Sequence, residues 1–336
     1  GVAVMKTLHF QSVFVGGCGT AAGPMEAQGP LKDKIDKLFD DIYCEEKTYE
    51  QAERRLMAEA CDYALRAQEL KTSDLDLVLG GDLLNQLGTS HYFARDLDIP
   101  FIGLYGACSN STLIAVNAAM WIDSGHAERV LGLTSSHNAT AERQFRYPNE
   151  YGVQKPETTT YTVTGAGAMI FQHEKSPIRL TQATLGRILD WQFTNPNDMG
   201  SAMAPAAFDT ICRHFENTGT SFDDYDLIVT GDLSKIGRSM LIDLFKQKGM
   251  NPHDKLIDCG LLIYDREHQE VFAGGSGCAC SAVVTIAYLF DLLRTKALHK
   301  IMVVATGALL STVIVQQKES IPCIAHAIVY EGTVSE

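Results

Sequence analysis

Residues 76–83 read DLVLGGDL, and residues 226–233 repeat the pattern as DLIVTGDL. Each stretch is a short apolar run that ends in Gly-Asp, which is typical of a buried strand that stops at a turn. A long-range repeat of this kind indicates that the chain consists of two related halves.

A second pair of matching segments follows in the same order. Residues 106–109 read GACS and open an amphipathic stretch, after which 129–134 is a predicted strand. Residues 278–281 read CACS and open a similar stretch before a predicted strand over 300–306. Two matching pairs in the same order indicate a duplicated architecture rather than a chance repeat.

The remaining pattern predicts an α/β fold. Helices are predicted over 49–70, 205–217 and 236–249, and further strands over 12–15, 166–172 and 324–330. This alternation favours mostly parallel sheets covered by helices on both faces. We expect a first half over 1–175, with a long excursion over 138–164, and a second half over 176–336.

Composition excludes several classes of protein. The chain of 336 residues has 28 Lys and Arg against 41 Asp and Glu, a net charge of -13, so we expect no nucleic-acid partner. Anionic lipids would repel such a chain, so membrane attachment would run through a protein partner. No leader or spanning stretch is evident, which favours a soluble cytoplasmic protein. The nine scattered cysteines predict free thiols and no structural metal.

Cys108 is the candidate nucleophile. It follows the strand-like FIGLYG of residues 101–106 and opens a predicted helix, where free N–H groups would stabilise a thiolate. The alternative is a small apolar residue packed at a strand-helix junction. His137 follows a strand end and is the nearest candidate base, whereas His326 lies in an apolar strand and fits a hydrogen-bonded core residue better.

Carboxylates and glycines mark further candidate positions. Asp82 and Asp232 end the repeated strands and would either bind a ligand or cap a helix, and we favour Asp82 for the site. The run GCGTAAG over 17–23 follows a predicted strand, but the prolines after it exclude a dinucleotide site. The GGSG run over 274–277 would let backbone approach a ligand or the other repeat.

The duplicated layout, the GACS helix start and the glycine-rich run 274–280 are similar to the thiolase and ketoacyl-synthase superfamily. Five longer strings resemble the stage V sporulation protein AD family. They are GDLLNQ at 81–86, TSSHNATAERQFRYP at 134–148, DMGSAMAPAA at 198–207, GGSGCACSA at 274–282 and QQKESIPCIAH at 316–326.

This resemblance implies a thiolase-like five-layered αβαβα fold built from two duplicated halves, and a homodimer. It also implies binding of dipicolinic acid (pyridine-2,6-dicarboxylic acid) for uptake in sporulation and release in germination. The chain would be the soluble member of the SpoVA channel assembly, held at the spore inner membrane by other SpoVA membrane proteins. No cofactor is implied, and calcium accompanying the ligand stays open.

The condensing enzymes of the superfamily pair their cysteine with His and His, or His and Asn, from the second half. This chain reads VTGD over 229–232 and GSG over 275–277 at those places, so we expect no catalysis and a vestigial nucleophile at Cys108. The alternatives are acyl transfer through Cys108, with His137 or His326 as base, and a ligand-free scaffold. The predicted ligand-binding residues are Cys108, Ser109, Thr134, Ser135, Ser136, His137, Asp82, Arg143, Gly275 and Ser276, with Arg146 as an additional contact.

Overall fold

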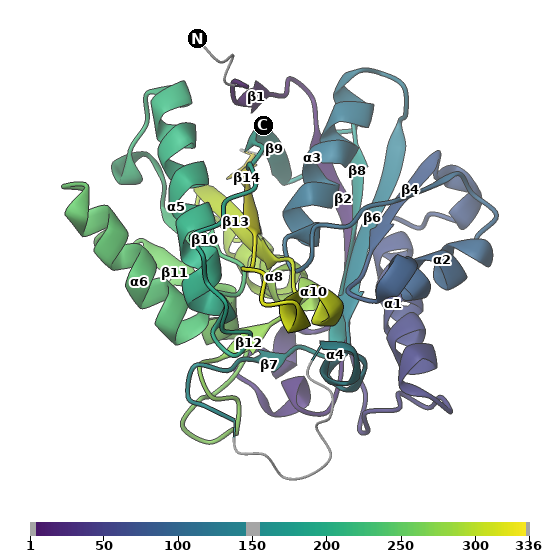
Figure 1. Cartoon of the computed structure of the whole chain (residues 1–336). Coiled ribbons are helices and arrows are strands. Elements are labelled where there is room, and N and C mark those ends of the chain that lie inside the picture. Colours follow the sequence, from purple (N-terminus) through teal and green to yellow (C-terminus); the bar gives the residue numbers. More distant parts are fainter. Residues whose placement is uncertain (1–4, 146–154, 334–336) are drawn as a thin grey trace.

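The computed structural model describes residues 5–145 and 155–333. Five layers are visible in Figure 1: an outer pair of helices, a sheet, a middle layer of helices, a second sheet and another outer pair. The predicted five-layered fold is therefore confirmed. The strands run in the order β11-β10-β13-β14-β9-β2-β8-β6-β4-β5.

The two halves of this order have the same design. In the first half β4 is parallel to β5 and β6, and β8 is antiparallel to β6 and β2. In the second half β10 is parallel to β11 and β13, and β14 is antiparallel to β13 and β9. The first-half strands are β2 (Phe14–Ala22), β4 (Leu77–Gly81), β5 (Phe101–Gly103), β6 (Arg129–Ser136) and β8 (Gly165–Gln172). The second-half strands are β9 (Ile178–Thr184), β10 (Leu227–Thr230), β11 (Leu256–Asp258), β13 (Lys300–Ala308) and β14 (Cys323–Gly332).

The halves join where β2 lies beside β9, through the pairs Phe14 with Arg179 and Val15 with Ile178. Both repeated motifs form the expected strands, β4 and β10. The sheets are less parallel than expected, because the strand next to each parallel set, β8 or β14, returns antiparallel. The last strand, β14, lies between β13 and β9 and not at an edge.

Four short strands complete the set. They are β1 (Leu8–His9) beside β9, β3 (Lys37–Leu38) beside β2, and the separate pair β7 (Tyr161–Thr162) and β12 (Gly275–Ser276). The GCGTAAG run lies mostly inside β2 and forms no turn, which corrects the predicted end of that strand at residue 15.

The middle layer consists of α3 (Asn110–Asp123) and the helical segment that begins with α8 (Cys278–Val284). Helix α3 packs against β4 and β6 on one side and against β13 and β14 on the other. A helix enclosed by two sheets must be apolar around most of its surface, which explains the sequence LIAVNAAMWI over 113–122. The segment continues as a π turn (Thr285–Leu289) and α9 (Phe290–Arg294).

Two helices cover each outer face. Helices α1 (Tyr49–Arg66) and α2 (Gly88–Arg95) lie on the first half, and α5 (Met199–Thr218) and α6 (Ser234–Gln247) on the second. Helix α5 begins six residues before the predicted start at Pro205, because the Asp198 side chain caps it by accepting a hydrogen bond from Ser201 N at 3.2 Å.

The smaller helices are α4 (Asn138–Phe145), α7 (Cys259–Leu262) and α10 (Thr312–Gln316). Helix α4 and strand β7 lie in the predicted excursion 138–164. This segment therefore contains regular secondary structure and is not simply a long loop. The 3-10 turns are Glu26–Gln28, Lys32–Lys34, Thr72–Asp74, Asn85–Leu87 and Phe222–Asp224.

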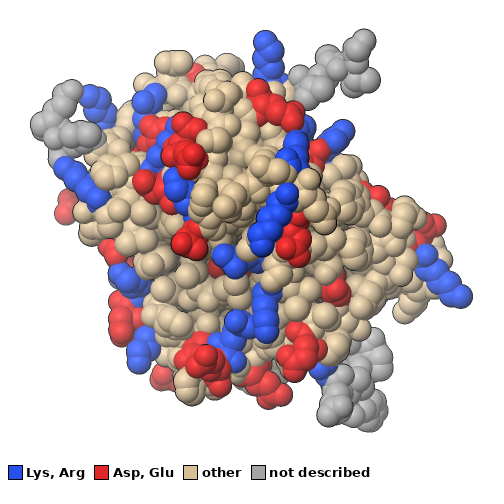
Figure 2. Space-filling view, turned by 90° about the vertical axis from the view of Figure 1, so that its left-hand side faces the viewer, with Lys and Arg blue, Asp and Glu red and all other residues tan. Residues whose placement is uncertain are grey.

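The surface of the second half mixes the two signs of charge. Figure 2, which views the molecule from the side of α5 and α6, shows a band of Lys and Arg with Asp and Glu beside it. Among residues 5–145 and 155–333, no helix combines the length and the apolar character that a membrane crossing needs.

Candidate functional site

The two halves meet at the turn that carries Cys108. This turn faces the start of α8 and the end of β13, and a small cavity of about 30 Å³ lies beside the thiol. Its polar lining comes from Tyr105, Cys108, Glu142, Thr162 and Ser276. Apolar side chains of Leu83, Ala141, Phe145, Met199 and Leu310 complete most of the wall. The cavity is therefore built from both halves of the chain.

The Cys108 turn is tightly held. Ala107, directly before it, has a left-handed φ of 50°, which is uncommon for a residue with a side chain. The Ser109 hydroxyl donates to Gly106 O at 2.6 Å. Gly307 of β13 packs so closely that a Cβ there would lie 2.2 Å from Gly106 O. Only glycine fits at 307, so the second half fixes the turn of the first.

Asp232 is the neighbour that defines the chemistry of Cys108. One carboxyl oxygen accepts from Thr306 Oγ1 at 2.7 Å, and the other accepts from Gly277 N at 3.1 Å. The Cys108 thiol also interacts with this carboxyl. Burial is the main reason that the pKa of Asp232 rises to about 7. Asp232, the repeat aspartate that we favoured less from sequence, is thus the one that interacts with Cys108, although it does not line the cavity itself.

The pKa of Cys108 is raised well above its usual value, first by burial and then by the charges of Asp232 and Cys278. This corrects the expectation that the helix start would stabilise a thiolate. Helix α3 begins at Asn110, two residues after Cys108, and burial is the largest cause of the raised pKa of the thiol. Cys108 is therefore held as a neutral thiol.

The start of α8 also depends on a special backbone shape. Gly277 has a φ of +99°, and a Cβ there would lie 2.7 Å from Ser136 Oγ. The following residue, Cys278, donates its thiol to Ala107 O at 3.1 Å. The glycine-rich run thus brings backbone of the second half against the Cys108 turn, one of the two roles expected for it.

Of the predicted ligand-binding residues, the structure brings Cys108 and Ser276 to the cavity wall. Four other predicted hydroxyls are fully or almost fully buried and donate elsewhere. Ser109 donates to Gly106 O, Thr134 to Gly81 O, Ser135 to Glu53 and Ser136 to Val163 O. In this structure three of these hydroxyls bond backbone carbonyls and Ser135 bonds the Glu53 carboxyl, and none of the four lines the cavity.

The other predicted residues also have partners in the fold. Asp82 accepts from Leu84 N and from Ser90, so it caps α2. His137 contacts Ile42 O at 2.8 Å, and burial lowers its pKa. Arg143 is half-exposed and pairs with Glu50. The carbonyl of Gly275 accepts from Ser234 Oγ at 2.8 Å.

The predictions for His326 and Arg146 have different outcomes. His326 is buried in β14, and its Nδ1 accepts from Gly186 N at 3.1 Å, as expected for a hydrogen-bonded core residue. Burial lowers its pKa to about 4. Arg146 lies outside the described residues.

Sequence reasoning missed several residues of the wall. Tyr105 and Thr162 carry hydroxyls, and Glu142 pairs with Lys155 at 3.1 Å. Phe145 and Leu310 come from α4 and from the segment before α10, which have no counterpart among the repeat motifs.

A larger groove of about 400 Å³ adjoins the cavity. Leu83, Tyr105, Phe145 and Leu310 line both, so these four side chains separate the two spaces. None of the residues that line the groove is charged. Leu309 and Val313 expose 48% and 62% of their surface at its rim. This uncharged groove gives the cavity a path to the surface.

No group of three or more His, Cys, Asp and Glu residues within 5–145 and 155–333 is arranged to hold a metal ion.

The sequence comparisons decide the family. The model of the family described as "Stage V sporulation protein AD" matches residues 4–331. The chain belongs to this family. A relative of the same name from Bacillus subtilis (strain 168) is 54% identical over 319 residues, which are 95% of this chain and 94% of the relative. The similarity to this relative therefore extends over nearly the whole length of the chain.

Solved structures with a similar fold are condensing enzymes. The 3-oxoacyl-[acyl-carrier-protein] synthase III of Aquifex aeolicus VF5 has a TM-score of 0.61 at 14% identity, covering 95% of this chain and all of the synthase. A variant of OleA from Xanthomonas campestris has a TM-score of 0.61 at 15% identity, covering 96% and 99%. At these identities the similarity establishes the thiolase-like fold of this family member and nothing about its activity.

Proposed function

We propose that this chain binds dipicolinate (pyridine-2,6-dicarboxylate) in the cavity beside Cys108 and catalyses no condensation. The supporting observation is a small cavity between the two halves whose hydroxyl groups, on Tyr105, Thr162 and Ser276, have no hydrogen-bond partner among the described residues. Free hydroxyls are suitable donors to carboxylates. The ligand class itself comes from the family resemblance.

The surroundings of Cys108 favour binding over catalysis. A nucleophilic cysteine needs a base, or cationic surroundings, that produce the thiolate. Here the neighbours are the carboxyl of Asp232 and the thiol of Cys278, and both raise the pKa of Cys108. A thiol kept neutral in this way is a poor nucleophile.

The size of the cavity requires it to open. A volume of about 30 Å³ holds roughly two water molecules, which is too small for a ring with two carboxylates. Tyr105 and Phe145 separate the cavity from the groove of about 400 Å³. We propose that binding displaces these two side chains and merges the spaces. Tyr105 is 44% exposed, so its movement costs little buried contact.

The cellular role follows the family. We propose that the chain acts in dipicolinic acid uptake during sporulation and in its release during germination, at the spore inner membrane. Other SpoVA membrane proteins would hold it there. The net charge of -13 supports attachment through protein partners rather than through anionic lipid. We also propose a homodimer, for which the unpaired edge strand β5 offers free backbone groups.

The test is calorimetric titration with dipicolinate, with and without calcium. We expect binding by the wild type, no binding by Cys108→Trp, which fills the cavity, and binding by Cys108→Ala. The matched control is Cys280→Ala, because Cys280 holds the equivalent place in the other repeat and lines no described cavity; its affinity should stay within about twofold. Thermal unfolding checks that each variant is folded.

Each other outcome has a clear meaning. Binding that survives Cys108→Trp overturns the assignment to this cavity. No heat with folded wild type overturns ligand binding and favours the scaffold. Acylation of Cys108 by a thioester, seen as a mass increase, favours the enzyme. Binding only in the presence of calcium would make the calcium chelate the ligand.

A further inference from the structure

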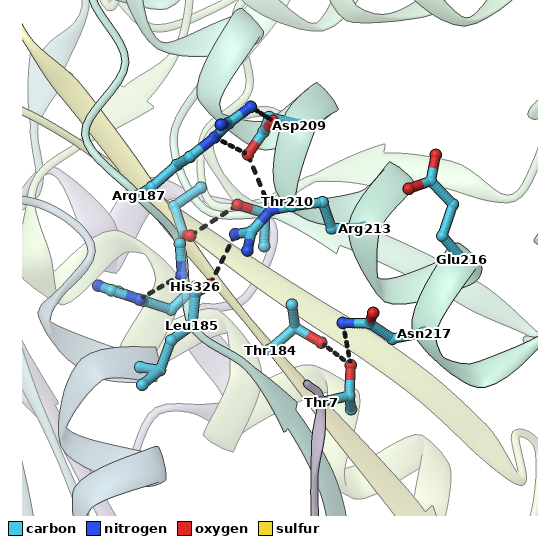
Figure 3. A network of polar contacts seen from close by, with 12 residues as sticks. Thr7, Thr184, Leu185, Arg187, Asp209, Thr210, Arg213, Glu216, Asn217 and His326 are labelled. Carbon is cyan, nitrogen blue, oxygen red and sulfur yellow. Dashed lines mark hydrogen bonds and ion pairs between the residues drawn. The ribbon is translucent and has the colours of Figure 1, made fainter. Parts of the chain in front are cut away.

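A second hollow lies on the surface of the second half. It has a volume of about 770 Å³ and lies between α5 and residues 185–191, the segment that follows β9. Figure 3 shows the polar side chains of this region, with Asp209, Arg213 and Glu216 on α5 and Arg187 on the segment that follows β9. None of the residues that line it lines the Cys108 cavity.

The polar wall contains two guanidinium groups that share one carboxylate. Arg187 donates to Asp209 through Nη2 at 2.6 Å and Nε at 3.2 Å, and Arg213 donates to it through Nε at 3.0 Å. Both guanidiniums converge on Asp209 in Figure 3. Two cations on one anion leave one positive charge uncompensated within this cluster.

A third cation lies in the same hollow. Lys248 Nζ is 3.3 Å from Glu216 and 5.8 Å from the ring centre of Phe208. The five charged residues of the lining therefore carry one net positive charge, although the whole chain carries -13. Such a local excess favours an anionic ligand.

Arg187 can reach a ligand without leaving Asp209 unpaired. Its side chain is 64% exposed, whereas Arg213 and Asp209 are 15% and 14% exposed. Arg213 is fixed further by donating from Nη2 to Leu185 O at 2.7 Å. When Arg187 turns toward a ligand, Arg213 still compensates the Asp209 carboxylate. A planar guanidinium is well suited to bind a carboxylate through two parallel hydrogen bonds.

The other walls are apolar and partly aromatic. Trp191 and Met5 line the hollow and are 49% and 51% exposed, and Phe208 and Pro205 line it from α5. A half-exposed tryptophan beside an uncompensated cation suits a ligand with a flat apolar body and a carboxylate.

The hollow is distant from the Cys108 cavity. Met199, at the start of α5, touches the cavity, whereas Arg213 lies fourteen residues further along the same helix. At 1.5 Å per residue this separation is roughly 20 Å. Occupation of one space therefore does not block the other.

We propose that this hollow is a second binding site, independent of Cys108, for small aromatic monocarboxylates such as benzoate. Arg187 binds the carboxylate, and Trp191 and Phe208 contact the ring. The assignment goes beyond the proposed function, because it does not depend on what occupies the Cys108 cavity.

Fluorescence of Trp191 tests the proposal. The chain has two tryptophans, so Trp121→Phe leaves Trp191 as the single emitter. In this background we expect benzoate to cause a saturable change in emission. Benzamide, which has the same ring but no charge, should bind about tenfold more weakly, since it lacks the charge-assisted hydrogen bonds.

Three variants locate the site. Arg187→Gln should weaken benzoate binding about tenfold. Arg66→Gln is the matched control, because Arg66 is also exposed and ion-paired, with Asp62, but lies on α1; it should leave binding within twofold. Cys108→Phe, which fills the first cavity, should also leave it within twofold.

The proposal is overturned by any of three results. They are the absence of a saturable change with folded protein, equal binding of benzamide and benzoate, and loss of binding in Cys108→Phe with Arg187→Gln unaffected. Only the last would leave the Cys108 cavity as the binding site, so the two proposals can fail separately.

Discussion

The two repeats place a cysteine and an aspartate at equivalent positions but use them differently. In the first half Cys108 borders a cavity, whereas its counterpart Cys280 is fully buried and donates to Gly231 O at 3.3 Å. Asp232 reaches across to Cys108, whereas Asp82 stays within its own half and caps α2. The duplicated fold thus has one cavity of this kind in its described part and not two.

Other equivalent residues have kept one role. Asp76 accepts from the backbone N–H groups of Glu128 and Arg129, at 2.8 and 2.9 Å. Asp226 accepts from those of His299 and Lys300, at 2.6 and 2.9 Å. Each aspartate therefore ties the start of its strand to the start of the next. Duplication preserved the residues that hold the scaffold, and the candidate site formed where the equivalence was lost.

The largest expected effect is a difference in stability between the variants Asp82→Asn and Asp232→Asn. Both oxygens of Asp82 accept from N–H groups, so Asp82→Asn forces an amide against a buried donor and should destabilise the fold by about 3 kcal/mol. One oxygen of Asp232 accepts from the Thr306 hydroxyl, which can rotate and accept from an amide. Asp232→Asn should therefore cost less than about 1 kcal/mol. Chemical denaturation measures both values, and equal losses would contradict this account.

A smaller effect concerns pH. Burial raises the pKa of Glu26 and Asp232 to about 7, of Glu53 to about 8 and of Asp258 to about 6. These carboxyls bind protons in the folded state that they have lost in the unfolded state, so stability falls as pH rises from about 5 to 8. Tm measured across this range should fall by several degrees.

The variant Asp232→Asn measures how much of this pH dependence of Tm is due to Asp232. Without the titrating group, the decrease in Tm between pH 5 and pH 8 should be smaller by about 3 °C, since 1 kcal/mol corresponds to a few degrees in a chain of this size. Asp226→Asn is the control, because the pKa of Asp226 is lowered rather than raised. An Asp232→Asn variant with the wild-type pH dependence would show that Asp232 titrates normally.

The smallest effect tests the residues that kept one role. Asp76→Ala and Asp226→Ala each remove two hydrogen bonds to N–H groups near the surface, so each should cost about 1 kcal/mol. We expect the two losses to agree within about 0.5 kcal/mol. A difference of more than twice that amount would show that the two halves differ in stability at this position.

The sequence predicted the fold well because its signals are local. The strand pattern of 76–83 and its repeat, the helix over 49–70 and the apolar final strand all lie close to the observed elements. The start of α5 was misplaced, since Pro205 resembles a helix start and the cap at Asp198 was overlooked. The predicted strand over 12–15 ends too early, since β2 extends to Ala22. Glycines usually weaken a strand, so the glycine-rich run was not assigned to it.

The site was harder to predict because its wall is assembled from distant segments. Cys108 and Ser276 were identified, since each lies in a distinctive motif. Ser109, Thr134 and Ser136 donate to backbone carbonyls around the cavity, and Ser135 donates to the carboxyl of Glu53. A one-dimensional pattern cannot tell which way such hydroxyls point. The positions of Tyr105 and Thr162 in the cavity wall depend on how distant segments pack together, so the sequence pattern did not predict them.

The position of β14 has a consequence for synthesis of the chain. This strand, residues 323–332, follows all the other described strands in chain order, yet it lies between β13 and β9 inside the sheet. The ribosome therefore makes β14 after the other described strands of the second half, and the edge of β9 that β14 covers stays open through most of the translation of that half. The first half has all five of its strands by Gln172 and can fold while the second is being made. A nascent chain stopped shortly before residue 323 should expose the flanks of β13 and β9 to chaperones.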